Sequence, residues 1–233
     1  MIAENLQRLK ERIILQCESS SRIINEIKLV AVSKYFGLDA ISEANRLGIT
    51  DFGENKAQEL RDKFQLLGDK VKWHFIGTLQ KNKVKYVVKA AALIHSVDSI
   101  TLADEINKQS EKLDKVQNVL LEIKTSSEET KSGLEKEEHI FKLAAHCNSL
   151  QYVALKGLMT MAPFTNEERL IRNSFSELCK LKDKLNQQGF NLSELSMGMT
   201  NDFEIAIDEG ATILRIGSAI FGSRDYSKDW RVQ

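Results

Sequence analysis

The sequence has little cysteine, little proline and no long apolar run, and each shortage excludes a class of protein. Cys17, Cys147 and Cys179 are odd in number and far apart within 233 residues, which fits neither a disulfide framework nor a CxxC metal site. We expect reduced, mostly buried thiols. No stretch reaches about 18 apolar residues, and charged side chains interrupt positions 1–15, so neither a membrane span nor a signal peptide is indicated. These absences predict a cytoplasmic protein that does not contact a membrane.

A surplus of charge is also absent. The 33 Lys and Arg residues balance 33 Asp and Glu residues, and the sequence pI is about 6.9. Nucleic acids and anionic membranes usually require a basic surplus, so neither is an expected partner. The four histidines show no HxxxH or HxH spacing, which gives metal chemistry little support. The expected partners are small molecules or proteins.

Short apolar or β-branched runs alternate with amphipathic stretches along the whole chain. The runs predict eight strands, at 28–33, 50–53, 73–77, 93–97, 118–124, 153–159, 192–197 and 213–218. The stretches with apolar residues three and four apart predict helices at 38–47, 55–67, 80–91, 99–116, 136–148, 166–188 and 200–209. A further helix at 3–18 precedes the first strand.

This alternation predicts one α/β domain over residues 1–233, a (β/α)₈ barrel with an extra N-terminal helix. A doubly wound open sheet is the structural alternative. In a barrel, functional side chains lie where the strands end and the following loops begin. The residues just after each apolar run are therefore the candidates for a site.

The first such residue is Lys34, which follows the apolar run Leu29-Val30-Ala31-Val32. Burial at a barrel mouth disfavours the charged ammonium and leaves an amine able to condense with a carbonyl. The alternative is a solvated lysine that begins a loop. One lysine alone does not define an active site.

The runs at 192–197 and 213–218 lead into segments suited to an anion. Ser196, Gly198 and Thr200 offer two hydroxyls and a tight turn, with Thr200 as a candidate N-cap of the next helix. Arg215, Gly217 and Ser218 add a cation, a small residue and a hydroxyl. Loops after strands seven and eight are the usual phosphate site of this fold. As alternatives, the glycines serve turns only and Arg215 pairs with a carboxylate.

Two other strand ends carry polar residues. Asn55 either lies at the mouth as a hydrogen-bond donor or caps the second helix. His74 sits inside the apolar run Trp73-His74-Phe75-Ile76, where a hydrogen-bonded core histidine is the favoured interpretation.

A mouth lysine together with a phosphate site suits a Schiff-base aldolase for sugar phosphates or a protein that holds pyridoxal 5′-phosphate (PLP). Segments spread over nearly the whole chain resemble the PLP homeostasis protein family. They are Ala31-Val32-Ser33-Lys34, Phe52-Gly53-Glu54-Asn55, 73–83 from Trp73-His74 to Asn82-Lys83, His95-Ser96-Val97-Asp98, Lys131-Ser132-Gly133, Gly157-Leu158-Met159, Leu195-Ser196-Met197-Gly198-Met199 and 215–222 from Arg215-Ile216-Gly217 to Phe221-Gly222.

The resemblance implies the barrel of the alanine racemase N-terminal domain and PLP binding in vitamin B6 balance without established turnover. It implies that Lys34 carries PLP as a Schiff base, that Arg215 faces the pyridine nitrogen and that Asn55 lies beside the ring. It assigns the phosphate to Ser196, Gly198, Thr200, Gly217 and Ser218. The implied partners are PLP and, as acceptors, apo PLP-dependent enzymes, and we expect a monomer.

The chain departs from the family where Tyr35-Phe36-Gly37 replaces the usual Thr-Lys-Pro, and where Thr200 replaces a serine while keeping the hydroxyl. Two alternatives stay open. An amino-acid racemase needs acid/base groups on both faces of the substrate carbon, and alanine racemase draws its second group from a further domain. A Schiff-base aldolase is expected to carry its lysine on a middle strand. Finally, the polar segment 125–133 predicts a mobile loop through which Lys131 gates release.

Overall fold

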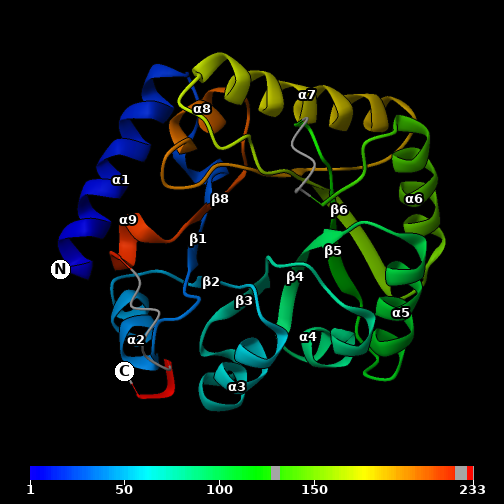
Figure 1. The fold of residues 1–233 in the computed structure, drawn as a ribbon, viewed down its shortest axis with the longest axis horizontal. Coiled ribbons are helices and arrows are strands. Elements are labelled where there is room, and N and C mark those ends of the chain that lie inside the picture. Colours follow the sequence, from blue (N-terminus) through cyan, green and yellow to red (C-terminus); the bar gives the residue numbers. More distant parts are fainter. Residues whose placement is uncertain (127–131, 224–229, 233) are drawn as a thin grey trace.

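The apolar runs form a ring of strands in the computed structural model, which describes residues 1–126, 132–223 and 230–232. Within this part of the chain, eight parallel strands pair in sequence order and β1 closes on β8 (Figure 1). They are β1 (Lys28–Val32), β2 (Asp51–Glu54), β3 (Lys72–Phe75), β4 (Ala91–Val97), β5 (Gln117–Glu122), β6 (Val153–Met159), β7 (Glu194–Ser196) and β8 (Ile213–Ile216). The predicted barrel is confirmed, and closure excludes the open sheet.

Helices follow the strands and surround them (Figure 1). They are α2 (Leu38–Arg46), α3 (Ala57–Leu67), α4 (Val84–Ala90), α5 (Ile100–Glu111), α6 (Glu137–Ser149), α7 (Glu168–Gln187), α8 (Phe203–Asp208) and α9 (Ser218–Phe221). The predicted helix at 80–91 begins as a 3₁₀ turn at Lys81–Lys83. Helix α9 was missed, because its four residues are too few to show a helical period and follow directly on the last strand.

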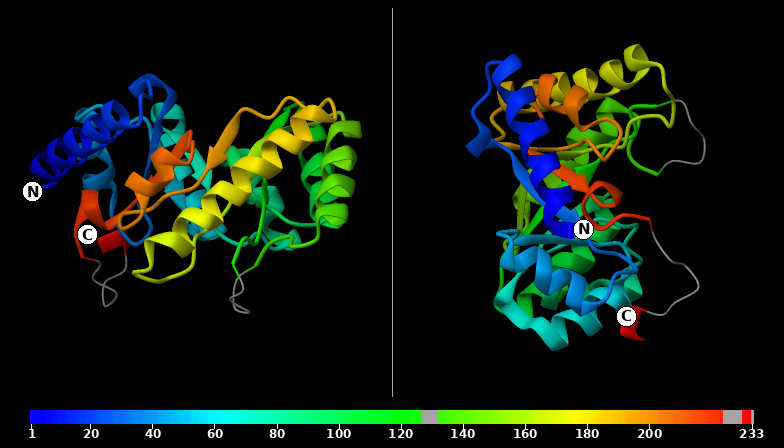
Figure 2. Two further views of the ribbon diagram at one scale, coloured as in Figure 1. Left: turned by 90° about the horizontal axis from the view of Figure 1, so that it is seen from above. Right: turned by 90° about the vertical axis from the view of Figure 1, so that its left-hand side faces the viewer.

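The predicted N-terminal helix is α1 (Ile2–Ser19), and it covers the seam where the barrel closes. Its buried residues Ile2, Leu6, Leu9, Ile13 and Cys17 recur every three or four positions and therefore share one face. That face packs against α8, α9 and α2, and both views in Figure 2 keep α1 beside α8 and α9. Elements from the two ends of the sequence are thus held together.

The barrel encloses a small apolar cluster that is separate from the main core. Val30, Leu93, Leu120, Met159 and Ile213 form this cluster, whereas the main core lies between strands and helices.

The backbones of β6 and β7 approach each other closely at Gly157. A Cβ on Gly157 would lie 1.9 Å from the carbonyl oxygen of Glu194, so only glycine fits there.

Two further expectations can be compared with the described residues. Cys17, Cys147 and Cys179 are free thiols, of which the first two are buried, as predicted. In the described part of the chain, no helix is both long and apolar enough to cross a membrane.

Candidate functional site

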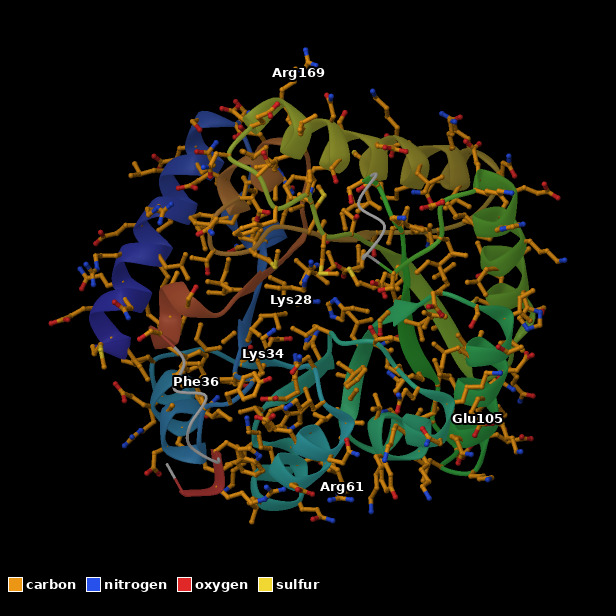
Figure 3. The ribbon with its side chains drawn as sticks, viewed as in Figure 1. Lys28, Lys34, Phe36, Arg61, Glu105 and Arg169 are labelled. Carbon is orange, nitrogen blue, oxygen red and sulfur yellow. The ribbon has the colours of Figure 1, made fainter. Side chains whose placement is uncertain are left out.

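The carboxyl ends of the strands surround an open cavity of about 1010 Å³. Six of the residues predicted for a site line it: Lys34, Asn55, Thr200, Arg215, Gly217 and Ser218. Figure 3 shows Lys34 inside the ring of helices, whereas Arg169 lies on its outside. Ser196 and Gly198 do not line the cavity.

Lys34 is half-buried at the point where the chain leaves β1. The next residue, Tyr35, has a φ of 71°, a left-handed conformation that costs a non-glycine residue about 1 kcal/mol. Two contacts hold this turn in place. The Tyr35 amide donates to Glu59 Oε1 at 2.8 Å, and the Phe36 ring stacks on Phe221 with centroids 4.8 Å apart. The backbone amide thus ties the lysine turn to α3, and the Phe36 ring, which belongs to the departure from the family pattern, ties it to α9.

A buried ionic cluster lies behind Lys34, and sequence reasoning missed it. The ammonium of Lys63 donates to Ser33 O at 2.9 Å and to Glu54 Oε1 and Glu59 Oε1 at 2.8 Å each. The Ser33 hydroxyl also donates to Glu54 Oε1, at 2.6 Å. Since Ser33 precedes Lys34 in the chain, the cluster fixes the backbone that carries the lysine. Its only sequence signal is Glu59 and Lys63 spaced four apart on one helix.

Burial dominates the electrostatics of this cluster. It raises the pKa of Glu54 to about 7, because the attraction of Lys63 only partly offsets the loss of water and the repulsion of Glu59. The Trp230 ring, with its centroid 5.1 Å from Lys63 Nζ, covers the cluster from outside. Arg231 pairs with Asp62 at 2.6 Å and holds this C-terminal turn, Trp230–Val232, on α3.

Asn55 follows β2 and presents an amide to the cavity. It does not cap a helix, because α3 begins after Lys56. Its Oδ1 atom is buried, with no hydrogen-bond partner among the described residues. Leaving such an atom unpaired costs about 1–3 kcal/mol, so the amide suits a ligand with a polar ring substituent.

The segments after β7 and β8 meet at one edge of the cavity. The Ser218 and Thr200 hydroxyls lie 3.1 Å apart, and the Ala219 amide donates to Thr200 Oγ1 at 3.3 Å. Gly198 makes the predicted tight turn, with a φ of 92°. The predicted N-cap was wrong, because α8 begins after Asp202, whose carboxylate accepts from the Met199 amide at 2.5 Å.

Arg215 forms part of the cavity floor and is 5% exposed. It donates to the Ser196 hydroxyl at 2.7 Å and to Thr160 O at 2.9 Å, and no carboxylate pairs with it in the described part of the chain. Burial lowers the pKa of Arg215 to about 10, opposed by Asp202 and Glu122, so the guanidinium stays charged at neutral pH. The cation is thus held by neutral partners.

Ser196 is fully buried below the cavity, where its hydroxyl also lies 2.9 Å from His95 Nδ1. His95 contacts His74, and His74 contacts Asp51. His74 is therefore the hydrogen-bonded core histidine that the sequence favoured. A direct contact between Ser196 and phosphate remains a prediction.

Sequence reasoning also missed Glu122, a carboxyl at the end of β5 that lines the cavity. Ser132 donates to it at 2.7 Å, yet burial raises the pKa of Glu122 above its usual value. Lys131, to which we assigned gating, lies outside the described residues, as does the whole segment 127–131. That role stays a prediction.

Comparison with known proteins places this barrel in a family. The model of the alanine racemase N-terminal domain matches residues 2–225. A pyridoxal phosphate homeostasis protein of Aquifex aeolicus is 44% identical over 226 residues, covering 96% of this chain and 98% of that protein. Among solved structures, PipY of Synechococcus elongatus with PLP bound is 33% identical with a TM-score of 0.84, covering 95% of this chain and 100% of that one.

The likeness extends more distantly to enzymes. An alanine racemase of Clostridium difficile is 16% identical with a TM-score of 0.75, and the match covers 95% of this chain and 58% of that one. Identity this low shows a shared barrel alone. The match to the Aquifex protein, in contrast, covers nearly the full length of both chains at 44% identity. The chain therefore belongs to the pyridoxal phosphate homeostasis protein family, built on the alanine racemase N-terminal barrel.

Proposed function

We propose that this chain binds PLP in the cavity at the barrel mouth, with Lys34 as its covalent anchor, and releases it to apo PLP-dependent enzymes. The observation that carries the proposal is the convergence of Lys34, Arg215 and the Thr200 and Ser218 hydroxyls on one cavity. PipY, a relative with the same fold, has been solved with PLP bound. The names of the homeostasis relatives assign no enzymatic activity, which favours a carrier.

PLP bound in this way supplies an aldehyde that a lysine amine can trap and a pyridine ring that can withdraw electrons. Lys34 supplies the amine, and the cluster around Lys63 fixes the backbone from which it projects. Thr200 and Ser218, with the turn at Gly217, supply hydrogen bonds to a phosphate. The Asn55 amide, which lines the same cavity with its Oδ1 atom unpartnered among the described residues, would hydrogen-bond to the ring.

The charge of Arg215 bears on how strongly PLP bound at this site can withdraw electrons. Its guanidinium is positive at neutral pH and, facing the pyridine nitrogen of bound PLP, would disfavour protonation of that nitrogen by like-charge repulsion. A ring kept unprotonated would withdraw electrons only weakly. The site therefore suits firm holding and release better than turnover.

The test is Lys34→Ala. We expect loss of the visible absorption band of bound PLP and loss of borohydride-dependent attachment, with an unchanged circular dichroism spectrum, since a half-buried mouth residue adds little to the core. Lys28→Ala is the control, because Lys28 begins the same strand at the opposite end. Mass spectrometry that finds the reduced cofactor on another lysine of the parent protein would overturn the assignment.

A further inference from the structure

A continuous hydrogen-bonded chain crosses the barrel interior below the cavity. Arg215 Nη1 donates to Ser196 Oγ at 2.7 Å, and Ser196 Oγ lies 2.9 Å from His95 Nδ1. His95 Nε2 lies 2.9 Å from His74 Nδ1, and His74 Nε2 lies 2.8 Å from Asp51 Oδ1. All five side chains are buried, from Ser196 and His95 at 0% exposed to Asp51 at 8%.

This row of hydrogen-bonded side chains, from Arg215 to Asp51, joins the two ends of the barrel. Arg215 lines the mouth cavity, whereas Asp51 lines a second cavity of about 510 Å³, shared with Lys28 at the amino ends of the strands. Thr50 donates to the second carboxylate oxygen of Asp51 at 2.6 Å, so both oxygens of that group are engaged. The far end of the chain is therefore fixed in position.

The two ends determine the direction of every hydrogen bond. A guanidinium can only donate, so the Ser196 oxygen accepts from Arg215 and its hydroxyl proton is free to go to His95 Nδ1. An ionised carboxylate can only accept, so His74 must carry a proton on Nε2. Neutral rings then leave one solution, in which His95 Nε2–H donates to His74 Nδ1.

Electrostatics agrees with this solution at both ends. Burial alone would raise the pKa of Asp51, but hydrogen bonds from His74 and Thr50 outweigh it and lower the pKa, so the carboxylate is ionised at neutral pH. Burial also lowers the pKa of His95 well below its usual value, and positive charge on His74 or Arg215 acts in the same direction. The assigned hydrogen bonds require His95 to be neutral.

We propose that His95 and His74 are positioning residues that act through Ser196 to hold the Arg215 guanidinium at the cavity floor. With His95 Nδ1 as its acceptor, the Ser196 hydroxyl points its proton away from Arg215 and its lone pairs toward the guanidinium. The hydrogen bond from His95 Nε2–H to His74 Nδ1 favours the tautomer of His95 that leaves Nδ1 free to accept. This row of hydrogen bonds thus sets the position of the cation that would face the pyridine nitrogen of bound PLP, an inference that rests on the proposed function.

The first test uses the protein without PLP, so it is independent of that function. Long-range ¹H–¹⁵N correlation spectra of the histidine rings at pH 7.5 report which nitrogen carries the proton. We expect His74 and His95 both to be neutral with the proton on Nε2, each assigned by loss of its signals in His74→Gln and His95→Gln. A proton on His95 Nδ1, or a doubly protonated His74, would refute the assigned directions of these hydrogen bonds.

The second test asks whether the hydrogen bonds of Ser196, His95 and His74 position Arg215. In ligand-free His95→Leu we expect the Arg215 side-chain protons to exchange with water about tenfold faster, because Ser196 loses its acceptor and reorients. His139→Gln, at an exposed histidine on α6, is the matched control and should leave exchange unchanged. Unchanged exchange in folded His95→Leu would refute a positioning role. Ser196→Ala against Ser196→Thr repeats the test, and only the hydroxyl-bearing variant should retain slow exchange.

The third readout is PLP itself. His95→Leu should weaken PLP binding in equilibrium dialysis by about tenfold and shift its absorption, because the cation no longer sits firmly by the ring, whereas borohydride should still fix PLP on Lys34. Parent-like affinity and absorption in His95→Leu would refute the coupling. A parent protein that binds no PLP would refute the proposed function instead, and the exchange rate of Arg215 would still decide the positioning role.

Discussion

Lys63→Met tests whether the ionic cluster behind Lys34 holds this end of the barrel together. The lysine side chain is 0% exposed and its ammonium bonds two carboxylates and one carbonyl at 2.8–2.9 Å. Methionine keeps much of the apolar stem but leaves Glu54 and Glu59 buried without their cation. Removing one partner from a buried ion pair costs about 3–5 kcal/mol, so we expect a loss of about 4 kcal/mol in the free energy of unfolding.

The assay is urea denaturation at pH 7.5, compared with Lys184→Met. Lys184 makes an ion pair of similar length, 2.9 Å to Glu137, with both side chains more than half exposed. Exposed pairs contribute about 0–1 kcal/mol, so this control should unfold nearly like the parent. Adding Glu54→Gln and Glu59→Gln to Lys63→Met should recover part of the loss. Equal, small losses in both lysine variants would refute the reasoning.

Three further predictions concern charge and packing. The folded-state pKa of Glu54, about 7, exceeds its ordinary value of 4.5, so the folded state binds more protons than the unfolded state between these two values. The free energy of unfolding therefore falls as pH rises through that window. Glu54→Gln should flatten this fall when urea titrations at pH 5 and pH 8 are compared. Gly157→Ala places a methyl 1.9 Å from a carbonyl oxygen of β7 and should cost at least about 3 kcal/mol in thermal unfolding, whereas Gly189→Ala, in open space at a φ of 91°, should cost about 1. Arg215→Glu should permit protonation of the pyridine nitrogen and change the absorption of bound PLP, and an unchanged spectrum at full occupancy would place Arg215 elsewhere.

The sequence predicts the barrel because the evidence for it is local. Apolar runs alternate with helical periods, and the strand ends of a parallel barrel all lie at one end. Lys34, Asn55 and Arg215 could therefore be placed at the mouth from their positions alone. The predicted Thr200 cap was wrong because α8 begins only after Asp202, and the Thr200 hydroxyl instead contacts the Ser218 hydroxyl and accepts from the Ala219 amide after β8.

Contacts across the barrel could not be predicted in this way. His95 contacts Ser196, and Lys63 contacts Ser33, only after distant strands and helices have packed. Each of these residues, taken alone in the sequence, looks like an ordinary core or surface residue. Ser196 shows the limit most clearly. Its place at a strand end predicts a phosphate contact, which stays a prediction, whereas its contacts with Arg215 and His95 in the barrel interior depend on residues 19 and 101 positions away in the sequence.

Closure of the barrel between β1 and β8 has a consequence for how the protein is made. Lys34 leaves the ribosome early, whereas its cavity partners Arg215 and Ser218 are among the last residues of the barrel to be synthesised. The cavity can form only when the final strand docks against the first, a contact that spans nearly the whole sequence and is slow to find. A nascent chain stalled before β8 should therefore fail to capture PLP although its lysine is already exposed to the solvent, so the binding site is assembled only when synthesis of the barrel is almost complete.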